Sequence, residues 1–131
     1  MNDEQANGKA NRLPPALELE AMKVLWASEK ELTVAQVQEA MQPYRPLAYT
    51  TVLTLLERLY RRGQVSRQKR GRGFAYRPVL DRDAALDLAL ARLVHDFFGN
   101  SRPRLLSYLQ KTLPPRDTGE SSPEELDSVL L

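Results

Sequence analysis

One stretch of this chain constrains its fold most: an apolar helical face followed directly by a basic hairpin pattern. Apolar residues at Val52, Leu55, Leu56 and Leu59 have the i, i+3, i+4, i+7 spacing of one side of an α-helix. Gly63 predicts the end of this helix, because glycine adopts most easily the left-handed conformation that follows a C-cap. The sequence therefore predicts a helix of about three turns with one buried face.

The residues after this glycine predict a two-stranded hairpin. Residues 65–70 alternate as a β-strand does, residues 71–73 (Gly-Arg-Gly) predict a turn, and residues 74–77 predict the returning strand. From Glu57 to Arg77 there are eight Lys or Arg and one acidic residue, whereas the whole chain carries a net charge of only +2. The hairpin and the end of the helix should therefore carry a strongly positive field.

The helix face opposite the apolar one is polar and ends in arginines. Short hydroxyl side chains near its start suit base edges, and arginines near its end suit phosphates. The glycines on both sides of Arg72 would let the turn approach a narrow groove closely. We therefore expect a DNA-binding surface. Its predicted contacts are Thr50, Thr51 and Thr54 for bases, Tyr49, Arg58 and Arg61 for phosphates, and Lys69, Arg70 and Arg72 in the wing formed by the hairpin.

Two other interpretations of this stretch stay open. A helix followed by a charged hairpin can be the solvated face of a small α+β domain, or it can bind a protein partner in place of DNA. A protein-binding surface would need an apolar or mixed patch. Charge sign, helix face and hairpin agree on one surface, and this agreement favours DNA.

Charge and periodicity divide the chain into segments. We expect a disordered tail over residues 1–12, a winged helix-turn-helix domain over residues 13–79, and a helical domain over residues 80–131. Residues 13–79 hold eleven basic and six acidic residues, a net charge of +5; residues 80–131 hold six and nine, a net charge of −3. This asymmetry suggests that only the first domain faces a polyanion. The expected fold class is mostly α with a small β-hairpin.

The C-terminal segment contains more apolar helical surface than it can bury alone. Helices are predicted from Asp81 to Phe98, after Ser101, and after Ser122. A domain of about 50 residues encloses only a modest core, so homodimerisation is the simplest way to cover this surface. The alternative is a monomer in which these helices pack on the first domain. The residues predicted to form the dimer contact are Leu86, Leu90, Leu93, Phe97, Leu105, Leu109, Leu126, Val129 and Leu130.

Composition argues against an enzyme and a membrane protein. There is no cysteine, and the single histidine, His95, has no nucleophile nearby in sequence. We expect neither a cofactor nor a metal site. No apolar run approaches the roughly 18 residues of a membrane span, and the polar start does not resemble a signal peptide, so a cytoplasmic location is expected.

With these residues in view, the chain resembles the BlaI/MecI (penicillinase repressor) family of winged-helix regulators. The resemblance covers roughly residues 13–131 and is strongest in the block AYTTVLTLLERL at residues 48–59. Leu25-Trp26, Gly63, Gly71-Arg72 and Tyr76 also match. The resemblance implies a dimeric repressor that binds an inverted-repeat operator through its third helix and wing, controlling a β-lactamase-like or stress-response operon linked to antibiotic resistance.

The resemblance also implies a route of inactivation. In the best-known members a membrane-bound sensor metalloprotease leads to cleavage of the repressor between an asparagine and a phenylalanine. The aligned residues here are Asn100 and Ser101, so the phenylalanine is replaced by serine. Copper-responsive relatives carry a cysteine cluster near the C-terminus, which this sequence lacks.

Overall fold

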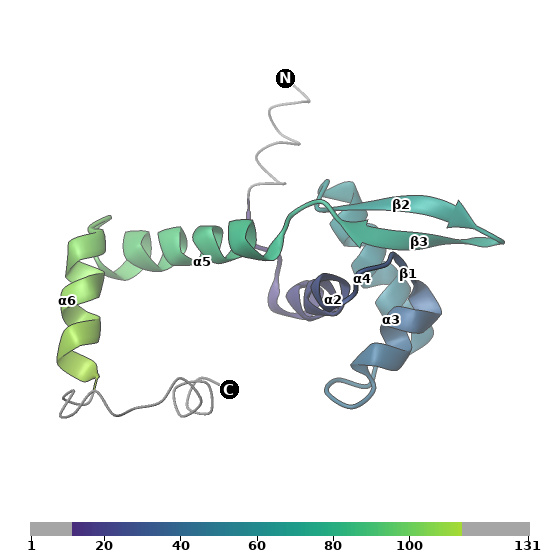
Figure 1. The fold of residues 1–131 in the computed structure, drawn as a ribbon, viewed down its shortest axis with the longest axis horizontal. Coiled ribbons are helices and arrows are strands. Elements are labelled where there is room, and N and C mark those ends of the chain that lie inside the picture. Colours follow the sequence, from purple (N-terminus) through teal and green to yellow (C-terminus); the bar gives the residue numbers. More distant parts are fainter. Residues whose placement is uncertain (1–11, 114–131) are drawn as a thin grey trace, which may run out of the picture. The chain divides into compact units, whose positions relative to one another are not determined.

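A computed structural model of the chain describes residues 12–113. These residues divide into two compact units whose boundary falls inside helix α5, between Arg92 and Leu93. The helices are α2 (Ala16–Ala27), α3 (Val34–Met41), α4 (Tyr49–Arg61), α5 (Arg82–Phe97) and α6 (Arg102–Thr112), and the strands are β1 (Leu32–Thr33), β2 (Val65–Arg70) and β3 (Gly73–Pro78) (Figure 1).

The first unit is a winged helix-turn-helix. Its three strands form an antiparallel sheet in the order β1-β3-β2, and β2 and β3 extend beyond β1 as the wing (Figure 1). The predicted class, mostly helical with a small hairpin and a winged domain, is confirmed. The sequence did not predict β1, because two residues, Leu32 and Thr33, are too short a run to show strand alternation.

The core of this unit lies between α2, α3 and α4, with the sheet closing one side. All four apolar residues that predicted α4 are buried, at 0–3% exposure. Tyr76 of β3 is also fully buried and is among the largest side chains in the core. Tyr76 packs with Val52, Leu56 and Leu59 in one buried hydrophobic cluster, whose other members are Ala21, Met22, Leu25, Val34, Val37, Met41 and Val65.

The helix ends follow the local sequence signals. Thr33 and Gln36 form a complete capping box at α3, in which Gln36 donates its backbone N–H to Thr33 Oγ1 and Thr33 N donates to Gln36 Oε1 at 2.9 Å. At α5, Ala84 N donates to Asp81 Oδ1 at 2.7 Å. Ser101 caps α6 in the same way. These three caps, each readable from the sequence, fix where the helices begin.

Trp26 holds the start of α5, which belongs to the first unit. Its ring packs against the core, and its indole Nε1 donates a hydrogen bond to the backbone oxygen of Leu80 at 2.8 Å. Ala85, in the first turn of α5, is buried at 4% exposure. The start of α5 is therefore held on α2, and Trp26 acts as a structural anchor.

Several sequence expectations lie outside the described residues. The predicted tail at residues 1–12 falls there except for Arg12, and so do Leu126, Val129 and Leu130. The domain boundary at residues 79 and 80 stays a prediction. Within residues 12–113, no helix is long and apolar enough to cross a membrane.

Candidate nucleic-acid interface

The exposed face of α4 is polar along its whole length. Thr50 and Thr54 are exposed one turn apart, and the Tyr49 side chain at the start of the helix is about half exposed. Thr54 Oγ1 donates to the backbone oxygen of Thr50 at 2.9 Å, so its hydroxyl has an internal partner in the free protein. Thr51 is half-buried at the edge of this face. Hydroxyls and a phenol on one helix face can contact base edges and phosphate oxygens.

The first turn of α4 has no side-chain cap. Ala48 stands at the N-cap with an extended backbone and no side-chain hydrogen bond. The first amide N–H groups of a helix have no partner inside the helix. Together with the positive end of the helix dipole, they favour an anion at this end of α4.

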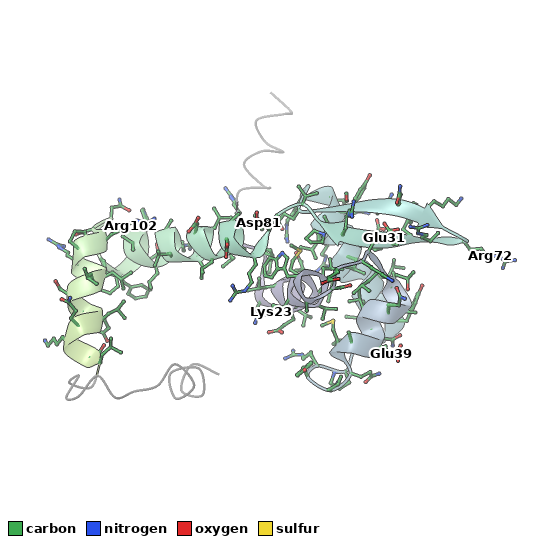
Figure 2. The ribbon with its side chains drawn as sticks, viewed as in Figure 1. Lys23, Glu31, Glu39, Arg72, Asp81 and Arg102 are labelled. Atoms are coloured by element: carbon green, nitrogen blue, oxygen red, sulfur yellow. The ribbon has the colours of Figure 1, made fainter. Side chains whose placement is uncertain are left out.

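The wing turns at Gly71 and Arg72, because Arg70 pairs with Gly73 in the sheet register. Gly71 has φ of 60°, in the left-handed region that the first position of a type II′ turn requires. Arg72 lies at the tip of the wing, and its side chain points away from the sheet (Figure 2). A long cation at an exposed tip can enter a groove or reach a phosphate.

The three predicted wing cations are not equivalent. Lys69 and Arg72 are exposed, whereas the Arg70 guanidinium is ion-paired with Glu31, just before β1. Arg70 would have to exchange this carboxylate for a phosphate in order to contact DNA. All three residues are exposed, so Arg70 differs from Lys69 and Arg72 by its ion pair and not by burial.

The start of α4 and the tip of the wing border one groove of about 470 Å³. Tyr49 and Leu53 line it from α4, and Arg72, Gly73 and Phe74 line it from the wing. The structure thus brings the helix part and the wing part of the predicted surface together. By contrast, Arg58 and Arg61 lie at the other end of α4, where they border a different groove with Arg12 and Arg62.

A polar junction that we did not predict joins α4 to the wing. Glu57 Oε1 accepts hydrogen bonds from Tyr76 Oη at 2.8 Å and from Arg67 Nη1 at 2.5 Å. The Arg67 guanidinium also lies between two rings, 4.0 Å from the centroid of Tyr60 and 4.1 Å from that of Phe74. Arg67 therefore holds the wing on α4 and is occupied inside the protein.

The junction shifts two pKa values in opposite directions. The hydrogen bond from Tyr76 and the nearby Arg67 hold the pKa of Glu57 below its usual value of 4.5. Burial, together with the Glu57 carboxylate, raises the pKa of Tyr76 from 10.0 to about 12. The pair thus favours an ionised Glu57 beside a protonated Tyr76 over the physiological pH range.

Two sequence signals could have indicated this junction. Glu57 is the one acidic residue in a basic stretch, and an isolated acid among cations often has a specific partner. Strand alternation also places Arg67 on the same side of β2 as the buried Val65. Which ring and which carboxylate Arg67 meets depends on the packing of β2 against α4, which local sequence does not give.

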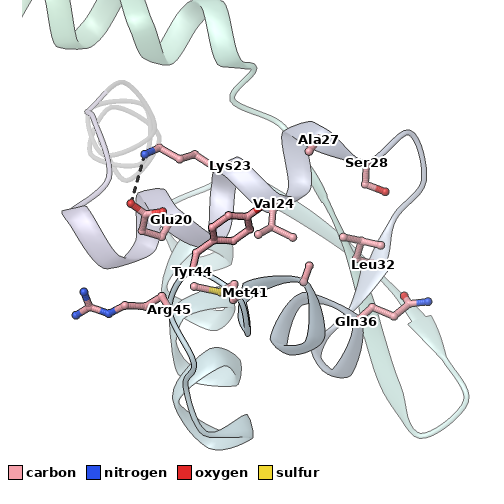
Figure 3. A pocket seen from close by; sticks show the side chains of 11 residues that line it. Glu20, Lys23, Val24, Ala27, Ser28, Leu32, Gln36, Met41, Tyr44 and Arg45 are labelled. Atoms are coloured by element: carbon pink, nitrogen blue, oxygen red, sulfur yellow. Dashed lines mark hydrogen bonds and ion pairs between the residues drawn. The ribbon is translucent and has the colours of Figure 1, made fainter. Parts of the chain in front are cut away.

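A third groove lies away from the interface. It has a volume of about 660 Å³, and Val24, Leu32, Met41 and Tyr44 supply much of its apolar lining, with the Lys23–Glu20 ion pair (3.3 Å) at its edge (Figure 3). All its lining residues come from α2, α3 and the segments next to them. None of the residues predicted to contact DNA lines this groove.

Helices α5 and α6 expose apolar side chains. Of the predicted dimer contacts, Phe97 is the most exposed, at 76% of its surface. Leu86, Leu93 and Leu109 are also exposed, and Leu90 and Leu105 are half-buried. Isolated exposed apolar residues are common, but several on neighbouring helix turns form a patch that usually meets a partner.

The turn between α5 and α6 contains the two residues predicted for cleavage. Gly99 and Asn100 both have positive φ, 56° and 61°. Asn100 is exposed, and Ser101 is half-buried as the N-cap of α6. Phe98 packs against Tyr108 of α6, with ring centroids 5.7 Å apart.

His95 lies on the surface of α5, with Nδ1 2.9 Å from Asp96 Oδ1. Residues 12–113 contain no group of three or more His, Asp or Glu side chains placed to hold a metal.

Comparisons with known proteins identify the family. Residues 15–129 match the family model described as penicillinase repressor. The chain is 43% identical over 67 residues to "Transcriptional regulator BlaI" of Mycobacterium tuberculosis, covering 51% of this chain and 49% of that protein. It is 27% identical over 94 residues to "Penicillinase repressor" of Bacillus licheniformis, covering 71% and 73%.

A solved structure agrees with the fold. The DNA-binding domain of the repressor BlaI, determined in solution, has a TM-score of 0.50 and 28% identity, covering 56% of this chain and 89% of that one. The chain spans about half the length of the Mycobacterium tuberculosis regulators that it matches. Because the family model covers nearly all of the sequence, the chain belongs to the penicillinase repressor (BlaI/MecI) family of winged-helix regulators.

Proposed function

We propose that this protein is a dimeric transcriptional repressor that binds a palindromic operator through α4 and the basic wing, and that it acts by binding rather than by catalysis. One observation carries the proposal: Tyr49 at the uncapped start of α4 and Arg72 at the tip of the wing border a single groove. The α4 face beside this groove is polar, and the wing is positively charged. A helix in the major groove with a wing on the backbone needs these two elements on one side of the protein.

The contacts divide by chemistry. Thr50, Thr51 and Thr54 would meet base edges or thymine methyl groups, and the Tyr49 hydroxyl would meet a phosphate. Lys69, Arg70 and Arg72 would hold the wing to the backbone or the minor groove. On DNA, the Thr54 hydroxyl would exchange its bond to the Thr50 carbonyl for a base contact, which costs little because both bonds are of similar strength.

The dimer would form through α5 and α6. The apolar side chains of α5 and α6 lie on successive helix turns, and Phe97 exposes three quarters of its surface in the single chain. A dimer with a twofold axis through such a patch would contain two copies of α4. Two α4 helices one DNA turn or more apart would contact the two halves of an inverted repeat.

The regulated operon and its signal follow from the family resemblance. We propose a β-lactamase-like or stress-response operon, with inactivation through a membrane-bound sensor metalloprotease. The point of cleavage would be Asn100–Ser101, in the exposed turn between α5 and α6. A cut there would separate α6 from α5 and remove part of the proposed dimer surface. An intact chain in induced cells, seen by mass spectrometry, would contradict this route.

The central experiment measures fluorescence anisotropy with the DNA upstream of the protein's own gene and with a scrambled duplex, at two salt concentrations. We expect the upstream DNA to bind at least about 10³-fold more tightly, with two chains per site. Equal and weak binding of both duplexes, with a steep loss in salt, would show a nonspecific basic surface. Binding of a protein partner would then become the better interpretation.

A further inference from the structure

Four arginines meet at the C-terminal end of α4. Arg58, Arg61 and Arg62 come from the last turn of α4 and the residue after it, and Arg12 comes from the segment before α2. Together with Leu13 and Pro15 they line a groove of about 560 Å³. We call it the arginine groove. Its six lining residues include no acidic side chain, so four positive charges face one space.

A buried carboxylate holds two of these arginines in place. Glu18 of α2 is only 3% exposed; its Oε2 accepts a hydrogen bond from Arg62 Nη1, and its Oε1 lies 3.9 Å from Arg58 Nη1. The Arg58 side chain is still 59% exposed, and that of Arg62 is 30% exposed. The carboxylate of Glu18 thus compensates one of the four positive charges. It also orients the guanidinium groups of Arg58 and Arg62, whose other N–H donors stay accessible. Preoriented guanidinium groups with spare donors are suited to phosphate.

The position of the arginine groove on α4 indicates which phosphates of the DNA it can reach. Arg61 is twelve residues after Tyr49, so it lies about 18 Å further along the helix axis at 1.5 Å per residue. The major groove of DNA is about 12 Å wide. A helix whose first turn sits in the major groove would therefore carry its last turn past the groove wall.

We propose that the arginine groove binds backbone phosphates of the DNA that flanks the operator half-site, as a contact surface separate from the α4–wing groove. This inference rests on the proposed function, because the DNA must already be held by the start of α4. The flanking contact is independent of sequence. It adds affinity and salt dependence without changing which bases are read.

The test compares two duplexes with the same centre. Base substitution across the upstream DNA first defines the base pairs that the protein recognises; one duplex ends at the outermost of these, and the other extends it by about ten base pairs on each side. The variant is Arg12→Gln/Arg61→Gln in the full chain, which removes two groove cations and leaves the Arg58–Glu18–Arg62 contacts in place. The control is Arg45→Gln/Arg77→Gln, which removes two exposed cations outside the arginine groove and causes the same change in charge.

We expect the wild type to bind the extended duplex more tightly than the short one. Each lost phosphate contact lowers the salt slope by about 0.9. The Arg12/Arg61 variant should therefore lose about 2 from the slope per chain on the extended duplex and almost nothing on the short one. The control should change both slopes equally. Circular dichroism melting of each variant checks that it folds, and the single variant Arg12→Gln provides a second measurement.

Two results would overturn this inference. One is an equal loss on both duplexes, which would place the arginines inside the half-site; the other is no loss on either. Failure of the proposed function gives a different result, since wild-type protein would then not distinguish the upstream DNA from the scrambled duplex at any length.

Discussion

Replacing Tyr76 with Phe tests the junction between α4 and the wing in two ways. The substitution keeps the buried ring and removes only the hydroxyl that donates to Glu57 Oε1 at 2.8 Å. A hydrogen bond to a charged group contributes about 1.5–3 kcal/mol. Glu57 keeps its bond to Arg67, so we expect Tyr76→Phe to lower the free energy of unfolding at pH 7.5 by about 2 kcal/mol.

The raised pKa of Tyr76 predicts how the stability of the protein depends on pH. The folded protein keeps the phenolic proton up to about pH 12, whereas the unfolded chain releases it near 10.0. Because the folded-state pKa is raised, the stabilisation is complete below pH 10 and is lost as pH rises toward 12. At 1.36 kcal/mol per pH unit, this shift corresponds to about 3 kcal/mol. Burial of the phenol is the largest cause of this shift and the bond to Glu57 the next, so the value includes more than the hydrogen bond.

Urea unfolding followed by circular dichroism, at pH values from 7 to 12, measures both effects. The wild type should start more stable and lose about 2 kcal/mol more than the Phe variant between pH 10 and 12, so the two curves should converge. Comparing the two proteins removes the contribution of other groups that titrate in this range. Equal stability at pH 7.5, or parallel curves up to pH 12, would refute a bond between Tyr76 and an ionised Glu57.

Three further predictions follow from other parts of the molecule. Arg72→Ala should lower the salt slope of DNA binding by about 0.9 per chain on every sequence, and an unchanged slope in anisotropy titrations would remove Arg72 from the contacts. Thr33→Ala breaks the capping box and should cost about 1 kcal/mol of stability in urea unfolding, with no effect expected only if Gln36 caps α3 alone. Phe97→Asp places a charge in the proposed dimer patch and should shift sedimentation from two chains to one; a dimer of unchanged stability would exclude Phe97 from the contact.

Local sequence patterns predicted the elements of the first unit well. The spacing of Val52, Leu55, Leu56 and Leu59 predicted the buried face of α4, and Gly63, which has φ of 76°, predicted its end. These signals succeed because they arise within one or two helix turns. The comparison with the family model then confirmed the resemblance that the block at residues 48–59 had suggested.

The contacts that sequence analysis missed join residues far apart in the chain. Glu18 pairs with Arg62, 44 residues away, and this ion pair orients one of the four arginines that line the arginine groove. Arg67 meets Glu57 from a different element. A charge pattern reports the sign of a surface but not which cations are occupied internally. Only the three-dimensional packing distinguishes Arg72, which is exposed, from Arg67, whose guanidinium is bonded to Glu57 inside the protein.

Selection from random DNA tests whether two copies of α4 bind one inverted repeat. The full chain is incubated with a library of duplexes, and the bound DNA is amplified and sequenced over several rounds. We expect enrichment of one motif made of two inverted half-sites, with centres one or more DNA turns apart. Enrichment of a single half-site would contradict the dimer, and no enriched motif at all would contradict sequence-specific binding.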